Sequence, residues 1–385
     1  MDYNISGDLI ISEIELEKNA SPKSNKSQAP SPPTAPPRVP SPPKSSTTIP
    51  KIEPIIKETN GINNQSNIVQ YRNNSSSNDN FKVLINSNNS NKLNKWILNS
   101  QVKPQSEISI PYMPLFLCSY GNLLFCMDNT SFLTIYEKAY SAELKLRNSC
   151  KLNVPNVKGI AVNGSYLAVA FSGLKKEQLK GTFKNMNPSG IVLFRRDEHV
   201  VCSIHEKCID LNKQDDNNNV SFKSLSGIAL NDKYLFACDT ELRSIYQFDI
   251  RNGSLIKTAL INDGQPTSIT INDNYLLFND SINSLIYVFD VNTLNLYSSI
   301  NLKDLDQLNG RFDLMITETD NYLFVKHSDN QLCLFDSNLE KRAFFNEIQY
   351  KILGFTMLKD NVNHMLVVGS LNTSKQQFKL HGYVA

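Results

Sequence analysis

The sequence has little of what marks membrane, secreted and strongly charged proteins. Its 385 residues include a single tryptophan, and 39 lysines and arginines nearly balance 37 aspartates and glutamates. The formal net charge of +2 provides no overall attraction to nucleic acid or to a membrane surface. No apolar run approaches the roughly 20 residues that a membrane helix needs, and the acidic N-terminal stretch is unlike a signal peptide. We expect a cytoplasmic protein, with the nucleus as the alternative, and no membrane partner.

Paired cysteines are absent as well. The seven cysteines form no C-x-x-C pair, and most stand inside apolar runs such as "LFLCSY", which is typical of buried thiols in a reducing compartment. One stretch, "HVVCSIHEKC", would place its two histidines and two cysteines on one face of a helix as a zinc site. Its β-branched residues favour a strand instead, which alternates faces and separates the set. We therefore predict no metal and no cofactor; the four residues concerned are His199, Cys202, His205 and Cys208.

The composition divides the chain into two territories. Residues 1–80 are rich in Pro, Ser and Asn, as in "SPKSNKSQAPSPPTAPPRVPSPPKSS", and have too few apolar side chains to offset the entropy of ordering. We expect a disordered arm there, followed by a weak strand at "FKVLI" (81–85). Residues 95–385 instead carry short apolar runs bounded by Asn, Asp, Gly and Ser, with at most one helical turn, at 302–310. Many short strands with regular turn signals predict an all-β domain.

The apolar runs repeat at a fixed period. Tyr166, Tyr234, Tyr275 and Tyr322 stand at matching places, 68, 41 and 47 residues apart. Each copy shows three short apolar runs and usually a fourth, weaker one. Four strands per unit at a period of about 45 residues is the signature of a β-propeller blade. The copies, six in number, run over 115–138, 159–173, 227–250, 268–290, 314–336 and 354–370.

A propeller buries the faces of its blades by closing into a ring, and closure needs one more strand. The last copy ends in "FKLHGYVA" and is one strand short. We predict that the segment "KWILNSQVK" (95–103) supplies the missing outer strand.

At 227–250 the sequence "GIALNDKYLFACDTELRSIYQFDI" resembles the NHL repeat, through Asp239, Arg243 and the closing Phe248. The copy at 268–290 keeps Asp280 and Asn283 but has Leu285 in place of the basic residue, and the other copies match more weakly. The resemblance implies a six-bladed propeller. WD-type blades are disfavoured because no Trp-Asp pair occurs, and kelch blades because no Gly-Gly pair occurs. Many NHL proteins carry a RING, but residues 1–95 contain no paired Cys/His cluster.

Catalysis finds little support in the sequence. A propeller enzyme needs carboxylates that converge on the innermost strands, and those strands offer only Asp313, with Asn156 and Gln265 as further candidates. No G-x-S-x-G elbow or phosphate loop is present. The acids that recur follow strands, where Asx-type turns are their ordinary role; they are Asp239, Asp249, Asp280, Asp290 and Asp336. We predict that the chain is not an enzyme.

The second copy carries an insertion, "LKKEQLKGTFKNMNPS" (174–189), with four lysines against one glutamate. A second enlargement at 210–224 is Asn-rich and typical of a flexible filler. The first insertion could form a protein-binding surface or, as the alternative, a cationic surface with an aromatic ring for RNA. The predicted surface comprises Lys175, Lys176, Lys180, Phe183, Lys184, Arg195 and Arg196. A solvated surface loop would have the same composition.

The arm contains short recognition signals. Pro33, Pro36 and Arg38 form a P-x-x-P-x-R pattern that suits an SH3 domain, although a plain linker has similar composition. Ser21 and Ser41 stand before prolines and are predicted phosphorylation sites. The segment 8–17 alternates apolar and acidic residues and could add to a partner's sheet edge. Together these features predict a monomeric, non-catalytic protein-interaction scaffold; an RNA-binding propeller or a substrate adaptor in ubiquitination is the alternative.

Overall fold

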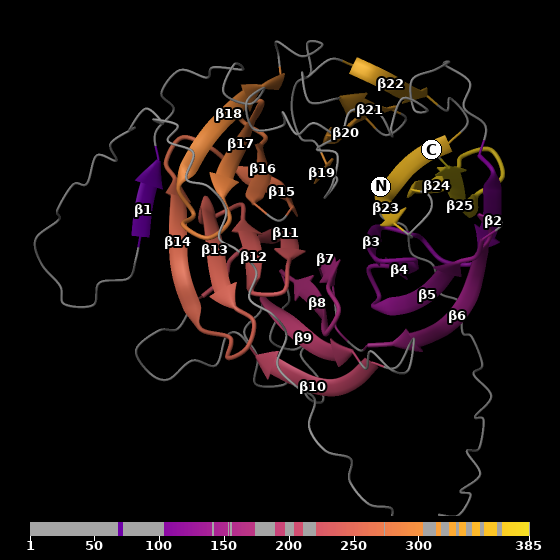
Figure 1. Ribbon diagram of the computed structural model, residues 1–385, viewed down its shortest axis with the longest axis horizontal. Coiled ribbons are helices and arrows are strands. Elements are labelled where there is room, and N and C mark those ends of the chain that lie inside the picture. The colour runs from indigo at the N-terminus through magenta and orange to yellow at the C-terminus, as the bar shows by residue number, and fades with distance from the viewer. Residues whose placement is uncertain are drawn as a thin grey trace, which may run out of the picture. The chain divides into compact units, whose positions relative to one another are not determined.

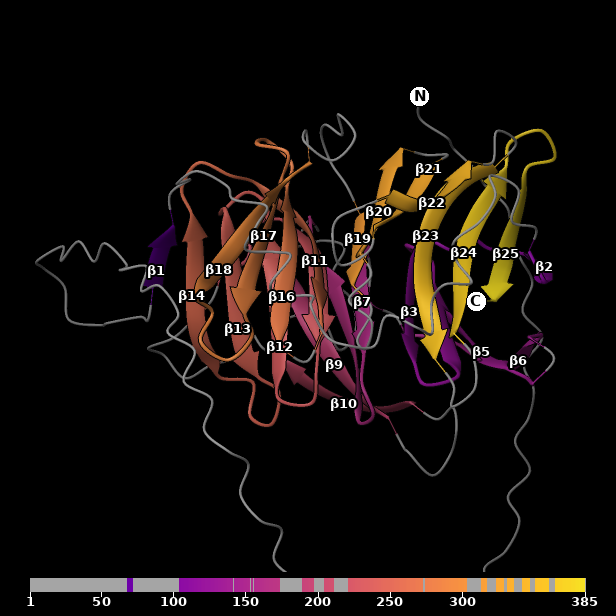
Figure 2. The same ribbon diagram turned by 45° about the horizontal axis from the view of Figure 1, so that its top comes forward.

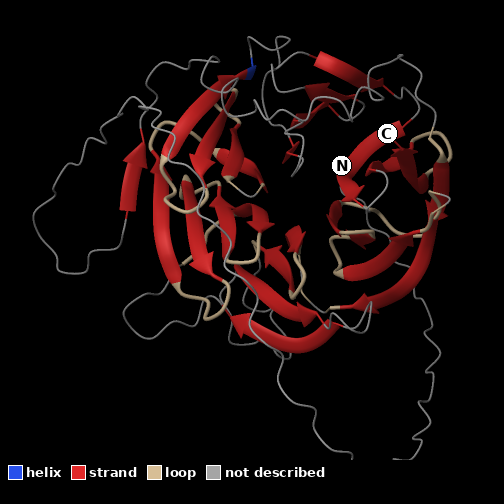
Figure 3. Ribbon diagram, in the orientation of Figure 1, coloured by secondary structure: helices blue, strands red, loops and turns tan. Residues whose placement is uncertain are grey.

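The structure, a computed structural model, describes residues 68–71, 104–140, 142–152, 154, 156–173, 189–196, 204–210, 221–272, 274–302, 313–316, 323–328, 331–335, 341–346, 350–359 and 364–384. Every described residue belongs to one unit of the chain, Glu58–Ala385. Within these ranges no helix has the length and apolar character that crossing a membrane requires. Strands joined by turns make up the described part, as Figure 3 shows.

Hydrogen bonding groups these strands into sheets of neighbouring segments, and five of the sheets have the four strands expected of a blade. The first contains β3 (Phe116–Tyr120), β4 (Leu123–Met127), β5 (Phe132–Lys138) and β6 (Leu144–Lys151), and the second β7 (Val157–Val162), β8 (Tyr166–Phe171), β9 (Gly190–Arg196) and β10 (Ile204–Asp210). Two more contain β15 (Pro266–Ile271), β16 (Tyr275–Asp280), β17 (Leu285–Asp290) and β18 (Leu296–Asn301), and β19 (Asp313–Ile316), β20 (Leu323–Ser328), β21 (Gln331–Phe335) and β22 (Lys341–Asn346).

The remaining two sheets each recruit a strand from earlier in the chain. One consists of β11 (Leu225–Leu230), β12 (Tyr234–Asp239), β13 (Ser244–Asp249) and β14 (Leu255–Ile261), with β1 (Ile68–Tyr71) as a fifth strand beside β14. The other consists of β23 (Tyr350–Lys359), β24 (His364–Asn372) and β25 (Gln377–Val384), completed by β2 (Ser106–Ile110).

The first strands of successive sheets contact one another. β3 contacts β7, β7 contacts β11, β11 contacts β15, β15 contacts β19, and β23 contacts β3 (Figures 1 and 2). Contacts of this kind place the first strand of each sheet toward a common centre and the fourth strand outside. The all-β, β-propeller arrangement predicted from the repeat is therefore confirmed.

Closure uses the expected device but a different segment. β2 pairs antiparallel with β25 in the register Ser106↔Gly382 to Ile110↔Phe378, so residues 106–110 supply the outer strand of the last sheet. The prediction had assigned this role to 95–103, which lies outside the described residues. "SEISI" alternates polar and apolar residues and buries Ile110, which suits an outer strand with one packed face.

Within residues 1–80, where a disordered arm is predicted, the structure describes one segment. Residues 68–71 form β1, which pairs in parallel with β14 in the register Ile68↔Thr258 to Tyr71↔Ile261. Three of its four residues are β-branched or aromatic, which favours a strand within the Asn-rich stretch. The rest of the predicted arm and the predicted strand at 81–85 lie outside the described residues, as does the predicted helical turn at 302–310 except for its first residue.

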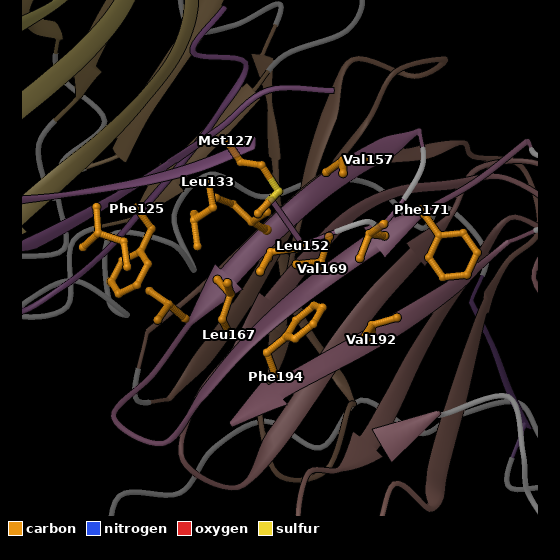
Figure 4. Close-up of a cluster of buried hydrophobic side chains, with 14 of the residues drawn as sticks. Phe125, Met127, Leu133, Leu152, Val157, Leu167, Val169, Phe171, Val192 and Phe194 are labelled. Atoms are coloured by element: carbon orange, nitrogen blue, oxygen red, sulfur yellow. The ribbon is translucent and has the colours of Figure 1, made fainter. Parts of the chain in front are cut away.

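The hydrophobic core lies between neighbouring sheets. Figure 4 shows the cluster between the first two, where Phe125 and Leu133 on one side meet Leu167, Val169 and Phe194 on the other. Equivalent clusters fill the next interfaces, and the closing phenylalanines of the NHL-like pattern, Phe248 and Phe289, are fully buried in them. Each sheet therefore covers the apolar face of its neighbour.

Close approach of the first strands depends on small residues. Gly227 lies on β11, and a Cβ atom there would stand 3.3 Å from Cγ2 of Ile269 on β15. That distance is tighter than ordinary van der Waals contact. Glycine at this position therefore lets two first strands pack side by side.

Three anchor tyrosines, Tyr166, Tyr234 and Tyr275, each begin the second strand of their sheet. In three sheets the asparagine three residues earlier accepts the tyrosine backbone N–H through its side-chain oxygen, at 2.7 Å for Asn163, 2.8 Å for Asn231 and 2.8 Å for Asn272. This Asx turn fixes the hairpin between the first two strands. The fourth predicted anchor, Tyr322, lies outside the described residues.

Candidate interaction face

The ends of the sheets form two faces. At one end lie the turns between second and third strands, such as Asp239–Ser244 and Asp280–Leu285, and the connections from one sheet to the next. We call this end the insertion face, because the chain leaves β8 and β10 there before the two insertions predicted from the sequence. At the opposite end, which we call the hairpin face, lie the turns that begin with Asn163, Asn231 and Asn272.

Two buried aspartates organise the insertion face. Asp239 and Asp280 end the second strands of their sheets, and both are fully buried. The Asp239 carboxylate accepts the backbone N–H groups of Glu241 and Leu242 in the turn that follows, at 3.1 and 2.9 Å. A carboxylate that accepts several backbone donors holds a turn rigidly.

The same carboxylate also reaches the connection that enters the sheet. Asp239 accepts the backbone N–H groups of Lys223 at 2.6 Å and Ser224 at 3.2 Å, immediately before β11 begins. Asp280 repeats this in the next sheet, where it accepts the N–H groups of Gln265 at 2.9 Å and Ile282 at 3.1 Å. Each aspartate therefore joins the start of the first strand to the turn after the second strand. We call the two residues the aspartate clamps.

The turn on this face has one further constant feature. The residue just before the third strand has a positive φ angle in four sheets: 67° at Ser131, 52° at Arg243, 56° at Ser284 and 53° at Gln376. A left-handed conformation costs a non-glycine residue roughly 1–2 kcal/mol. Backbone N–H groups of the turns donate to side-chain oxygens that offset this cost, those of Asp128, Asp239, Asp280 and Asn372. These hydrogen bonds therefore fix the backbone conformation of the turns on this face.

Among the described residues, two exposed apolar side chains lie on this face. Ile282 in the β16–β17 turn is 56% exposed, and Met113 in the β2–β3 connection is 36% exposed. The neighbouring sheet of β11 to β14 contributes polar groups to the same face: Lys223 pairs with Glu241 at 3.4 Å, and Arg243 donates to the carbonyl of Asn262 at 3.0 Å. The described part of this face therefore combines single exposed apolar side chains with polar groups.

The structure places the described part of the predicted basic surface at the other end. Arg195 and Arg196 end β9 at the hairpin face, whereas the insertion leaves β8 and enters β9 at the insertion face. β9 has seven residues, so these two points are separated by roughly 20 Å along the strand. Lys175, Lys176, Lys180, Phe183 and Lys184 lie outside the described residues, as do Pro33, Pro36, Arg38, Ser21 and Ser41 of the arm.

Arg196 connects the first two sheets. Its guanidinium carbon lies 5.0 Å from the ring centroids of both Tyr120 and Phe125 on the first sheet. The same guanidinium donates to the carbonyl of Asn163 in its own sheet. Cation–π contacts with two rings stabilise the interface, while Arg195 beside it is exposed. The pair therefore combines a structural arginine with a solvent-facing one.

The three channel candidates have local partners. Asp313 pairs with Lys326 of the same sheet at 3.3 Å. Asn156 donates to the carbonyl of Ser172, and the side-chain oxygen of Gln265 accepts from Ser281 at 3.3 Å. Within the described ranges no group of three or more acidic, histidine or cysteine side chains could hold a metal ion. Of the predicted zinc alternative, His199 and Cys202 lie outside these ranges, and the side chains of His205 and Cys208 are not described.

One constellation of chemistry-bearing residues was not foreseen. Ser370 Oγ lies 2.8 Å from His381 Nε2, and His381 Nδ1 lies 3.5 Å from Glu107 Oε2. This is the order of a Ser–His–Glu triad, but Ser370 is only 1% exposed in an interior strand of its sheet. A nucleophilic serine must be presented to substrate at a turn or cleft, with donors for the oxyanion beside it. These three residues therefore link β24, β25 and β2, and they stabilise the pairing that closes the ring.

Charge supports that closure. Glu107 on β2 also pairs with Lys379 of β25, which lowers the pKa of the Glu107 carboxyl and raises the pKa of the Lys379 amine. Burial lowers the pKa of His381, against the opposing effect of Glu107. The His381 ring packs against Tyr350 at a centroid distance of 4.9 Å. These contacts hold β2 on the sheet in addition to the backbone pairing.

Sequence reasoning assigned the recurrent acids to Asx turns, and Asp239, Asp249, Asp280 and Asp290 are confirmed in that role. It missed the second contact of the clamps, because nothing in a local pattern shows that the carboxylate reaches back about 15 residues. It also missed Ile282 and the Glu107–His381 contact, which joins residues far apart in sequence. The asparagine turns had a visible signal, since "NGSYL", "NDKYL" and "NDNYL" share the spacing of Asn and Tyr.

No family model matches the sequence, and the search of curated proteins found no match.

Proposed function

We propose that the chain is a six-bladed, NHL-like propeller that acts as a non-catalytic protein-interaction scaffold. The blade count is supported by the five four-stranded sheets together with the sheet of β11 to β14, in which β1 is an addition to an ordinary blade. The NHL-like character is supported by the aspartate clamps. In the two copies that most resemble the NHL repeat, these aspartates occupy the position of the acidic residue of that repeat.

The observation that carries the proposal is the rigid insertion face. Asp239 and Asp280 fix both the turns and the strand starts there, so the surface is ordered before a partner arrives. A preordered surface loses little conformational entropy on binding. Ile282 is an apolar anchor that stands exposed on it. Loops at one end of a rigid propeller are a usual location for partner contacts.

The arm completes the proposal. Its P-x-x-P-x-R segment, at Pro33, Pro36 and Arg38, would recruit a protein with an SH3 domain, and phosphorylation of Ser21 and Ser41 would regulate recruitment. In this proposal the chain is a cytoplasmic or nuclear monomer that brings two partners together. A substrate adaptor in ubiquitination is one form that such a scaffold could take.

RNA binding is the second candidate, and one observation favours it. Tyr120 is 46% exposed and carries the Arg196 guanidinium against its ring, and the exposed Arg195 also ends β9 at the hairpin face. Aromatic rings beside arginines are the usual contacts for single-stranded nucleic acid. The near-neutral net charge weighs against a strong general attraction to RNA.

The test is cross-linking of the full chain in cells, followed by separation of RNA adducts from protein adducts. The proposal predicts protein adducts that survive replacement of Lys175, Lys176, Lys180 and Lys184 by Glu. RNA adducts that are lost in this variant, or in Arg195→Glu, would establish the second candidate instead. Lys145→Glu, a charge reversal at an exposed residue of the outer strand β6 and on neither face, serves as the control for the effect of charge alone.

A further inference from the structure

The sheet of β11 to β14 differs from the other sheets of the described part by its fifth strand. Ile68–Tyr71 pairs in parallel with Thr258–Ile261 at the outer edge of β14. Figures 1 and 2 both show β1 beside β14, outside the four-stranded unit. A fourth strand of a blade normally ends the sheet, so β1 marks an edge that accepts an additional strand.

The chemistry of β14 explains why this edge is receptive. Its sequence, "LIKTALI", contains one charged residue, Lys257. Most other outer strands carry more charge: β6 has Lys145, Arg147 and Lys151, and β22 begins with Lys341 and Arg342. Charged side chains are a common protection of sheet edges, and an edge with little charge permits pairing with another strand. β18 has no charge either, so low charge permits the addition of a strand but does not alone select β14.

The pairing of β14 with β13 indicates which half of β14 can accept a further strand. A register shift lies between Gln247 and Phe248, opposite the first residues of β14, whereas Thr258, Ala259 and Leu260 pair regularly with β13. A bulge twists an edge and disfavours further pairing, while a regular segment presents evenly spaced N–H and C=O groups. β1 pairs with the regular segment, from Thr258 to Ile261.

The sequence of β1 also indicates which kind of strand pairs with this edge. "IVQY" is uncharged, and three of its four residues are β-branched or aromatic. Four residues form few hydrogen bonds, and these are offset by the entropy lost in ordering the segment. Covalent attachment compensates by giving the segment a high effective concentration. A strand of the same character that another protein presents in an already extended form would lose less entropy on pairing with Thr258–Ile261, and it would replace β1.

We propose that the outer edge of β14 is a strand-addition site for an extended, uncharged segment of a protein partner, and that Ile68–Tyr71 occupies this site until the partner displaces it. Backbone hydrogen bonds would provide the binding, and alternate side chains of the added strand the selectivity. The site is separate from the insertion face, so either can fail without the other.

The experiment compares amide hydrogen exchange in the full chain and in the Val69→Pro variant. Proline within β1 removes an N–H donor and is poorly tolerated in a strand. We expect exchange of the outer amides of β14 to accelerate at least tenfold in this variant. Exchange in β18, an uncharged outer strand to which no described residues add a strand, should not change and reports that the propeller remains folded. Val83→Pro, in another apolar segment of the N-terminal region, is the matched control and should leave β14 unchanged.

The second part adds a synthetic peptide of residues 65–74 to each protein. It should restore protection of β14 in Val69→Pro and should protect β18 in neither protein. In the unaltered chain the peptide should act only at a concentration at least tenfold higher, because β1 already fills the site. Equal exchange of β14 in the unaltered chain and in Val69→Pro would overturn the proposal, and so would a peptide without effect on either. Protection of β14 that depends on protein concentration and accompanies dimerisation in light scattering would assign the edge to a second copy and would also overturn it.

Discussion

The aspartate clamps allow a quantitative prediction. Replacing Asp239 by Ala removes the acceptor of four backbone N–H groups, those of Lys223, Ser224, Glu241 and Leu242. Lys223 and Glu241 are exposed, so water can satisfy their N–H groups, whereas those of Ser224 and Leu242 are partly buried. Two hydrogen bonds to a charged acceptor at about 1.5 kcal/mol each give a loss of about 3 kcal/mol. The unfolding temperature should then fall by roughly 6–12 °C.

Two further variants separate the causes. Asp239→Asn keeps the oxygen that accepts from Ser224, Glu241 and Leu242, but its amide group would face the Lys223 N–H. We expect about half of the effect of the alanine variant. Glu241→Ala is the control, because this side chain is 60% exposed and forms only a surface ion pair. Its effect should stay within about 0.5 kcal/mol.

The assay is urea unfolding followed by circular dichroism, with hydrogen exchange of β11 and of the β12–β13 turn as the local measurement. The clamp predicts that exchange accelerates at both places together, since one carboxylate holds both. An Asp239→Ala variant as stable as Glu241→Ala would refute the reasoning. Faster exchange in the turn alone would refute the link to the first strand.

The remaining predictions concern pH, packing and thiol reactivity. Burial lowers the pKa of His381 from its ordinary value of 6.5, so the unfolded chain takes up a proton that the folded chain does not. Stability should fall as the pH drops below about 6.5, and the dependence should flatten in His381→Gln, measured by urea unfolding at several pH values. Gly227→Val should destabilise by roughly 1–3 kcal/mol because its Cβ would stand 3.3 Å from Ile269, whereas Gly159→Ala, with ordinary 3.6 Å contacts, should cost less. Cys238 is fully buried, and burial raises its pKa; it should react with a thiol reagent only after unfolding, and labelling of the native protein at the unfolded rate would contradict its burial.

The sequence contained enough information for the blade pattern but not for long-range pairing. Period, turn residues and the anchor tyrosines are local signals, and the strands at Tyr166, Tyr234 and Tyr275 begin where they predict. The closing strand was placed about ten residues too early, since many short apolar segments could pair with β25. β1 was missed for the same reason, because four residues in an Asn-rich stretch have no periodicity of their own.

In the candidate site, too, features set by adjacent residues were predicted, whereas features set by the direction of a strand were not. The turn-forming aspartates were recognised because an Asx turn is a property of adjacent residues. The predicted basic surface grouped Arg195 and Arg196 with the insertion because they are near in sequence, yet they lie at the opposite end of β9 from the points where the insertion joins the blade. The direction of a strand is needed to assign a residue to a face, and composition carries no such direction.

The most direct test of the proposed function places one photo-reactive amino acid on each face. Ile282 on the insertion face and Tyr120 on the hairpin face are matched positions, since both are exposed apolar side chains in turns or strand ends. Our account predicts that the probe at position 282 forms a discrete protein adduct in cells, resistant to nuclease, and that the probe at position 120 does not. Adducts at position 120 alone, or adducts that nuclease removes, would contradict the protein-interaction function of the insertion face.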